Sequence, residues 1–101
     1  MSTTRIEQHL GAVADAAAIG QLRNLGPRSA AWLVAAGIGT VGELRRLGAV
    51  AAFRRVRANA AAGVSLNLLW AMAAGLLDMH WTHLPADIKS RLLNELERPD
   101  G

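Results

Sequence analysis

The sequence predicts an all-α protein, a single small domain of five to six short helices. A chain of 101 residues is long enough for one modest hydrophobic core. Its apolar content is 51%, much of it alanine, which is the best helix former. Apolar residues recur every three or four positions between glycines and prolines, which is the pattern of amphipathic helices joined by tight turns.

The first segments of the chain lead into a tight hairpin. Residues 1–18 predict a tail or a short helix, because apolar side chains recur there at helical spacing, at Ile6, Leu10, Val13 and Ala17. Residues 19–25 are expected to form one or two helical turns. Pro27 ends them, because the residue before a proline avoids the α region, and it suits the first turn of a helix over residues 28–36.

Glycines and a capping pair delimit the next two helices. Gly37 is expected to end the preceding helix in the left-handed conformation. Thr40 and Glu43 have the spacing of a capping box, which predicts a helix over residues 41–47 that ends at Gly48. A further helix is expected over residues 49–60, with its arginines outside and an apolar stripe of Val50, Phe53 and Val56.

Two more helices complete the expected domain over residues 19–97. Ser65 is the predicted N-cap of a helix over residues 66–79, which is apolar on nearly all sides, as a central core helix should be. Pro85 opens the last helix over residues 86–97, with a stripe made of Ile88, Leu92, Leu93 and Leu96. Residues 98–101 are expected to form a disordered tail.

The composition also excludes several classes of protein. The absence of cysteine rules out disulfides, thiolate catalysis and zinc sites with cysteine ligands. It fits a reducing compartment, and with no secretory signal at the start we predict a cytoplasmic protein. Residues 58–77 carry no charge, but polar residues and glycine interrupt the run, so it predicts a buried core helix and no membrane span.

Neither a metal site nor a catalytic site is predicted. His80 and His83 are three residues apart, whereas a zinc site needs three or four ligands. We expect His80 to pack or to cap a helix C-terminus, where a cation is favoured. No serine has a base at a motif spacing and no glycine-rich phosphate loop occurs, so we predict no enzyme and no cofactor.

The stretch Asn24-Leu25-Gly26-Pro27-Arg28-Ser29 is the strongest candidate for a binding site. It is similar to the helix-hairpin-helix motif, Gly-hydrophobic-Gly-Pro-basic, with Asn24 at the first glycine position. Asparagine tolerates the left-handed region better than most residues, so the turn is expected to form. Amides of such a turn and of the following helix attract anions, which predicts sequence-independent contact with a DNA backbone. The alternative is a packing turn without a ligand.

The positive charge is concentrated in one part of the chain. Residues 21–60 hold seven arginines against one acid, while the remaining residues hold four basic side chains against seven acids. A polarised surface of this kind attracts polyanions, although a solvated arginine face is the simpler alternative. We expect a wider, weaker basic footprint around the turn, made of Arg23, Arg45, Arg46, Arg54, Arg55 and Arg57.

Several stretches closely resemble the C-terminal domain of the TfoX/Sxy family. They lie between Ile19 and Leu96, and are Asn24-Leu25-Gly26-Pro27, Ala36-Gly37-Ile38, Leu47-Gly48-Ala49-Val50, Ser65-Leu66-Asn67-Leu68-Leu69 and His80-Trp81. The family contains bacterial regulators of natural competence, which act on the expression of DNA-uptake genes. The resemblance implies a helical domain with a transcription-linked role and no catalytic residues. Longer members carry an N-terminal domain, so we expect a free-standing C-terminal domain here.

Two functions remain open from the sequence. The first is a non-catalytic regulatory module that contacts the DNA backbone through the hairpin. The alternative is a protein-interaction module, in which Trp81 and His83 dock a transcription regulator, an RNA polymerase subunit or a second copy of the chain. The position of Arg28 relative to the other arginines, and the apolar surface around Trp81, are expected to discriminate between them.

Overall fold

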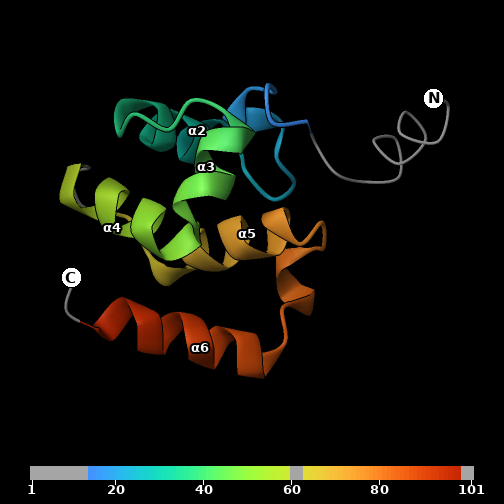
Figure 1. Ribbon diagram of the computed structural model, residues 1–101, viewed down its shortest axis with the longest axis vertical. Coiled ribbons are helices and arrows are strands. Elements are labelled where there is room, and N and C mark those ends of the chain that lie inside the picture. Colours follow the sequence, from blue (N-terminus) through green and yellow to red (C-terminus); the bar gives the residue numbers. More distant parts are fainter. Residues whose placement is uncertain (1–13, 60–62, 99–101) are drawn as a thin grey trace, which may run out of the picture.

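Helices account for nearly all the regular structure of this protein. The computed structural model describes residues 14–59 and 63–98. Their elements are η1 (Ile19–Gln21), α2 (Pro27–Ala35), α3 (Val41–Leu47), α4 (Ala49–Asn59), α5 (Leu66–Leu76), η2 (Trp81–His83) and α6 (Ala86–Glu97). Figure 1 shows them in three tiers, with α2 and α3 in the first, α4 and α5 in the middle, and α6 in the last. The predicted all-α class is therefore confirmed.

The turn after α2 forms as the sequence predicts. Gly37 has a φ of 86°, in the left-handed region that favours glycine. The amide of Gly37 donates to the carbonyl of Val34 at 3.0 Å, and the amide of Ile38 donates to that of Leu33 at 2.8 Å. These two hydrogen bonds form a Schellman motif, and Ile38 is buried against the core behind it.

A complete capping box starts α3. The Glu43 carboxylate accepts hydrogen bonds from the Gly39 amide at 2.9 Å and the Thr40 amide at 3.0 Å. It also accepts one from the Thr40 hydroxyl, and the Glu43 amide donates back to that hydroxyl at 3.2 Å. The Gly39 amide first, then the Thr40 hydroxyl and amide, hold the pKa of Glu43 below its usual value. The ends of α3 agree with the prediction from Thr40 and Gly48.

The helix α5 is the central element but ends three residues earlier than predicted. Asp78 takes a left-handed φ of 56°, and the Met79 amide donates back to the carbonyl of Ala74 at 2.9 Å. The expected end at Met79 was wrong. A helix end of this form usually has glycine at the left-handed position, and here aspartate takes that position, so the sequence does not mark the end. Ser65 caps its start as predicted, because its hydroxyl accepts from the Asn67 amide.

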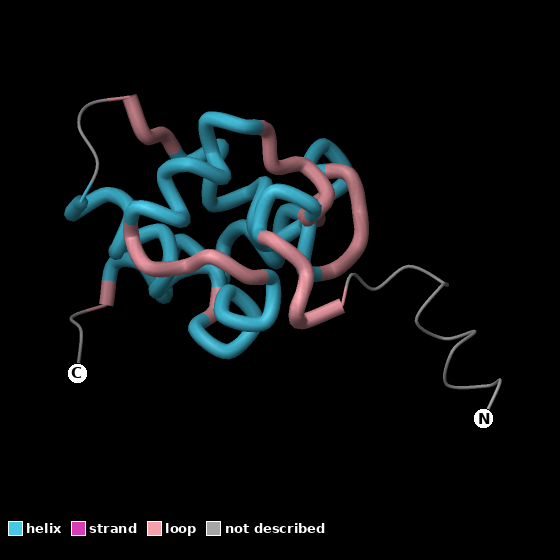
Figure 2. Tube along the Cα trace, turned by 90° about the horizontal axis from the view of Figure 1, so that it is seen from above, coloured by secondary structure: helices cyan, strands magenta, loops and turns pink. Residues whose placement is uncertain are grey.

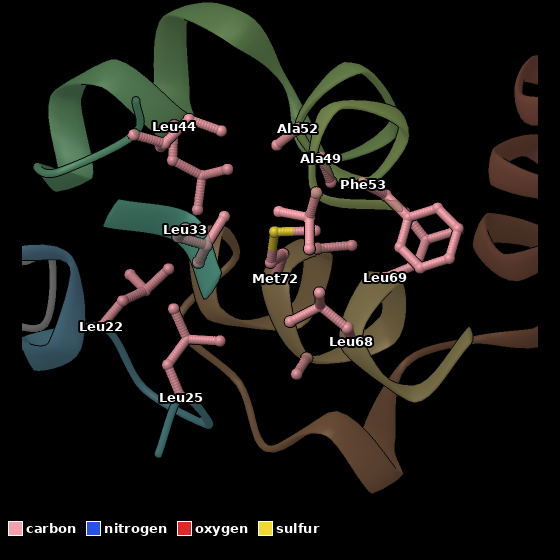
Figure 3. Packing of buried hydrophobic residues seen from close by; sticks show 14 of the residues in the cluster. Leu22, Leu25, Leu33, Leu44, Ala49, Ala52, Phe53, Leu68, Leu69 and Met72 are labelled. Atoms are coloured by element: carbon pink, nitrogen blue, oxygen red, sulfur yellow. The ribbon is translucent and has the colours of Figure 1, made fainter. Parts of the chain in front are cut away.

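The hydrophobic core lies between α2, α4 and α5. Figure 3 shows Met72 of α5 near the middle of the cluster, with Leu33 of α2 on one side and Phe53 of α4 on the other. All three side chains are almost fully buried. Within the described ranges, no helix is long and apolar enough to cross a membrane.

Residues 15–19 and the helix α6 lie at the periphery of the domain. Residues 15–19 run along residues 39–42, with backbone hydrogen bonds between them and an isolated bridge between Ala18 and Thr40. The described part of the chain contains no strand (Figure 2). The helix α6 packs on α4 through half-buried side chains, and none of its residues is fully buried. The predictions for residues 1–13 and 99–101 lie outside the described residues.

Candidate functional site

The predicted hairpin joins η1 to α2 and is anchored on both sides of its turn. Leu22 and Leu25 are buried in the core, and they hold the two arms of the turn against the rest of the domain. Asn24 has a φ of 77°, which agrees with the left-handed conformation expected of the residue in the first glycine position. Gly26 is the N-cap of α2 in extended conformation, and Pro27 is the first helical residue.

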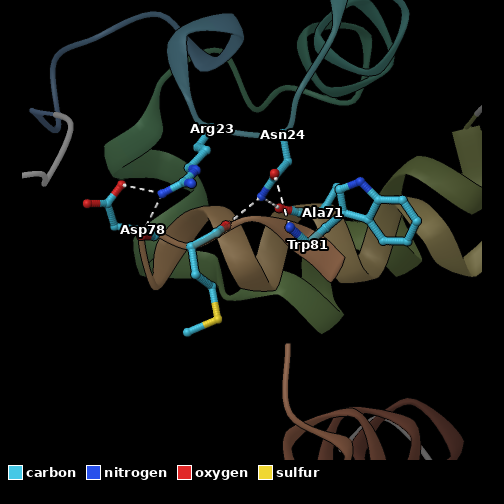
Figure 4. A network of polar contacts seen from close by, with 6 residues as sticks. Arg23, Asn24, Ala71, Asp78 and Trp81 are labelled. Carbon is cyan, nitrogen blue, oxygen red and sulfur yellow. Dashed lines mark hydrogen bonds and ion pairs between the residues drawn. The ribbon is translucent and has the colours of Figure 1, made fainter. Parts of the chain in front are cut away.

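The Asn24 side chain is directed into the protein and not toward solvent. Its Nδ2 donates to the carbonyl of Met79 at 3.0 Å and to that of Ala71 at 3.3 Å. Its Oδ1 accepts from the Trp81 amide at 3.2 Å. Figure 4 shows this side chain reaching down onto α5, between the two carbonyl groups and the Trp81 backbone. The turn is thereby attached to α5 and to the start of η2.

The outer corner of the turn consists of exposed backbone and the Arg28 side chain. Gly26, Pro27 and Arg28 are exposed, and a Cβ added to Gly26 would meet no atom within 4 Å. The amides of Arg28 and Ser29 belong to the first turn of α2, where no helical carbonyl is available to accept from them. The Arg28 guanidinium lies 6.0 Å from the centre of the Trp32 ring, beside the same helix end.

Three of the arginines in the predicted footprint cross-link elements of the domain. Arg23 donates to the Asp78 carbonyl at 3.0 Å and lies 3.9 Å from its carboxylate, beyond the end of α5. Arg45 pairs with Asp15. Arg54 donates to three carbonyls at the end of α6, those of Glu95, Leu96 and Arg98.

The other three footprint arginines lie at the surface, on the helices α3 and α4. Arg46 is on α3, and Arg55 and Arg57 are on α4. All three are exposed, and the Arg57 guanidinium lies 5.3 Å from the centre of the Phe53 ring. Arg23 and Arg28 stand on either side of the turn itself, and the wider footprint around the hairpin stays a prediction.

A hollow of about 320 Å³ opens beside the hairpin. The start of α2, the segment leading into α5 and the η2 turn form its walls. Its lining residues are Asn24, Ser29, Trp32, Gly63, Ser65, Asn67, Leu68, Ala71 and Trp81. None of them carries a charge, and two of them are tryptophans. This hollow could not be predicted from the sequence, because its residues come from segments that are far apart in the chain.

Trp81 and His83 lie on the exposed surface, as the protein-interaction alternative requires. The Trp81 side chain is 38% exposed, with the His80 ring stacked beside it at 6.1 Å between centres. The other exposed large apolar side chains are Val34 on α2, Leu66 at the start of α5 and Leu77 after its end. Leu66 and Leu77 are separated by the length of α5, about 16 Å, so they do not form one patch.

His80 fills one of the two roles expected from the sequence. It is the N-cap of η2, and its Nδ1 accepts from the Thr82 amide at 3.3 Å. Of the two roles predicted for His80, the helix C-terminal cap is wrong, because α5 ends before His80, whereas packing agrees with the stacking of its ring on Trp81. Among the described residues, no group of three or more histidine, aspartate or glutamate side chains is arranged to hold a metal ion.

The fold and the turn place the chain in the class of small all-α domains built on a helical hairpin. A family model described as the TfoX C-terminal domain matches residues 15–96, and the chain belongs to this family. The family is one of non-enzymatic regulatory domains related to competence. Neither the curated proteins nor the solved structures contain a match to the chain.

Proposed function

We propose that this domain contacts the DNA backbone through its hairpin, without reading sequence, as part of a cytoplasmic regulator of DNA-uptake genes. One observation carries the proposal. The Asn24 side chain is bonded into the protein, so the left-handed turn forms without a side chain over its outer corner. Gly26, the first amides of α2 and the Arg28 guanidinium remain at that corner.

The physical basis is the affinity of a helix start for an anion. The amides of Arg28 and Ser29 have no helical acceptor, and the dipole of α2 adds partial positive charge at the same end. A phosphate oxygen accepts from such amides, and a guanidinium forms a charge-assisted hydrogen bond with it. No acidic residue lies in the first turn of α2 to oppose the phosphate.

The interface is expected to be small and sensitive to salt. Arg23, Arg45 and Arg54 already have partners within the domain, so few cations are left to neutralise phosphates near the turn. For one to three phosphates, the slope of log affinity against log salt is about −1 to −3. We therefore expect weak binding to any duplex, strongest at low ionic strength.

Fluorescence anisotropy with a labelled random-sequence duplex tests the proposal. Titrations from about 50 mM to about 200 mM salt cover the range in which backbone contacts weaken steeply. Arg28→Glu places a negative charge at the helix start, and should weaken binding by about tenfold or more. Gly26→Ala adds a methyl group to the outer corner and should also weaken binding, since the space in front of Gly26 is open.

Arg91→Glu is the matched control, because Arg91 is an exposed arginine on α6. It makes the same change of net charge and should weaken duplex binding much less than Arg28→Glu. Equal losses from the two variants would show that only net charge matters and that the hairpin is not a phosphate site. Absence of wild-type binding at the lowest salt would also overturn the proposal.

Docking of a protein partner is the second candidate, and the exposed Trp81 indole with the nearby His83 is the observation that favours it. Large aromatic side chains are the usual anchors of protein interfaces. The separation of Leu66 from Leu77 leaves no broad apolar patch along α5 to support such an interface. This candidate becomes the leading one if the wild-type domain binds no DNA.

A further inference from the structure

The hollow beside the hairpin has the composition of a site for a planar, polar ring. Trp32 and Trp81 supply aromatic surface from two different elements, α2 and η2. Ser29, Ser65 and Asn67 add hydroxyl and amide groups, which donate and accept hydrogen bonds. An aliphatic side chain would offer these polar groups no hydrogen bond, and a metal ion would find no charged ligand among the lining residues.

The surroundings of the hollow favour a ligand attached to negative charge. The N-terminal ends of α2 and α5 both border it, because Ser29 and Ser65 lie in its wall. Arg28 stands next to Ser29, and its guanidinium lies 6.0 Å from the centre of the Trp32 ring. Among the described residues, no carboxylate lines the hollow. A phosphate at the hairpin corner would therefore be adjacent to a cavity that suits an aromatic ring.

We propose that this hollow receives an unpaired base of a single DNA strand whose neighbouring phosphate lies on the hairpin. The inference rests on the proposed function and names the form of DNA that it favours. Bases stack on exposed tryptophan rings with little dependence on sequence. In an intact duplex the bases are paired and stacked, and extracting one costs a few kcal/mol. A single strand presents its bases without that cost, so it should bind more tightly than a duplex.

Anisotropy with a labelled oligothymidylate and with a blunt duplex of the same length tests this inference. The wild-type domain should bind the single strand several-fold more tightly than the duplex. Trp81→Ala should weaken single-strand binding by about tenfold, the effect of one stacked base, and leave duplex binding nearly unchanged. Addition of the oligonucleotide should also quench the tryptophan fluorescence of the wild type.

Two further variants separate stacking from loss of structure. Trp81→Phe keeps an aromatic face and should retain most of the affinity for the single strand. Leu77→Ala removes an exposed apolar side chain outside the hollow and should have no effect. The hydrogen bond to Asn24 comes from the Trp81 backbone, so Trp81→Ala leaves it in place. Circular dichroism and urea unfolding confirm that each variant is folded.

The outcomes distinguish failure of this inference from failure of the proposed function. Equal binding of both DNA forms, with no effect of Trp81→Ala, would overturn the inference and leave an Arg28-dependent hairpin site intact. Single-strand binding that depends on Trp81 but not on Arg28 would show a base site without a phosphate on the hairpin, which would overturn the hairpin proposal and the placement of that phosphate. A folded wild type that binds neither DNA would overturn both, and Trp81 would then be assigned to a protein partner.

Discussion

Asn24 performs two tasks in one side chain, because it tolerates the left-handed backbone and also attaches the turn to the domain. Its carboxamide donates to two carbonyls, those of Ala71 and Met79, and accepts from the Trp81 amide. Glycine suits the same backbone conformation but makes none of these bonds. Aspartate accepts but does not donate. The shape of the turn therefore depends on asparagine in particular.

We expect Asn24→Gly to lower the free energy of unfolding by about 1–3 kcal/mol, because two part-buried hydrogen bonds and one exposed hydrogen bond are lost. The loss should occur although glycine adopts a φ of 77° more easily. Urea unfolding followed by circular dichroism measures it. An Asn24→Gly domain as stable as the wild type would show that the backbone conformation matters and the side-chain bonds do not.

The conformation of Asn24 could be predicted from the sequence, but its partners could not. The Asn-Leu-Gly-Pro pattern indicates a turn with a left-handed first residue, and the structure confirms it. The three partner groups belong to the backbone of residues 71, 79 and 81. Every residue has the same backbone groups, so the sequence does not indicate which of them will bind Asn24. Only the packing of the turn on α5 brings these groups near the Asn24 side chain. The hollow was missed for the same reason.

At the scale of single elements, the capping box of α3 links stability to pH. Hydrogen bonds from the Gly39 and Thr40 amides and the Thr40 hydroxyl lower the pKa of Glu43 in the folded state. Its contribution to stability is therefore complete above the pKa of an unfolded glutamate, about 4.3, and is lost as the pH falls through the lower folded value.

We expect Glu43→Gln to reduce the loss of stability in that acidic range, because the carboxylate is no longer there to be protonated. Urea midpoints measured from about pH 5 downward test this. Glu97→Gln is the control, since Glu97 is an exposed residue at the end of α6, and its profile should follow that of the wild type. Identical profiles for wild type and Glu43→Gln would contradict the prediction.

A glycine inside α5 permits the close approach of the hairpin. A Cβ added to Gly75 would lie 2.6 Å from the Arg23 carbonyl oxygen and 3.0 Å from Cγ of Leu22. Alanine is preferred over glycine in a helix by about 1 kcal/mol, but overpacking costs about 1–3 kcal/mol. Because the clashing atom is backbone, we expect the overpacking to dominate and the free energy of unfolding of Gly75→Ala to fall.

Thermal or urea unfolding of Gly75→Ala measures whether the cost of overpacking exceeds the gain in helix propensity. Gly26→Ala is the matched control, because nothing lies within 4 Å of its added Cβ and its φ of −94° suits any residue. It should cost less than Gly75→Ala. A Gly75→Ala domain more stable than the wild type would show that the hairpin moves away from α5 without loss.

Helix ends could be predicted where a side chain marks them. The capping box and Gly48 mark the ends of α3, and Pro85 marks the start of α6, so their bounds agree with the sequence analysis. The end of α5 depends on Asp78 in a left-handed conformation, which aspartate adopts only when its surroundings support it. Arg23 lies against Asp78 from 55 residues away in the chain, a contact without a local signal.

At the scale of the whole molecule, α6 is the α-helix without a buried residue among the described α-helices. Its apolar stripe is half-buried against the core. Two cations help to hold it: Arg54 at its last carbonyls and Lys89, whose Nζ lies 5.6 Å from the centre of the Trp70 ring. The carbonyls at a helix C-terminus carry partial negative charge, which explains the position of Arg54.

We expect Arg54→Met to increase hydrogen exchange at the C-terminal amides of α6 and to lower global stability by about 1 kcal/mol. Arg55→Met is the control, because Arg55 is the exposed neighbour on α4. Hydrogen exchange measured by mass spectrometry should become faster in α6 for Arg54→Met and should stay unchanged for Arg55→Met. Equal protection of α6 in both variants would show that apolar packing alone holds this helix.

The Asn24 bonds also set an order for folding. They join residues that are 47 to 57 positions apart, so they form only after α5 and η2 have been placed. The Schellman turn after α2 and the capping box of α3 close within a few residues and need no such partner. During synthesis the hairpin therefore reaches its final shape only after Trp81 has left the ribosome, and substitution of Asn24 should speed unfolding far more than it slows folding.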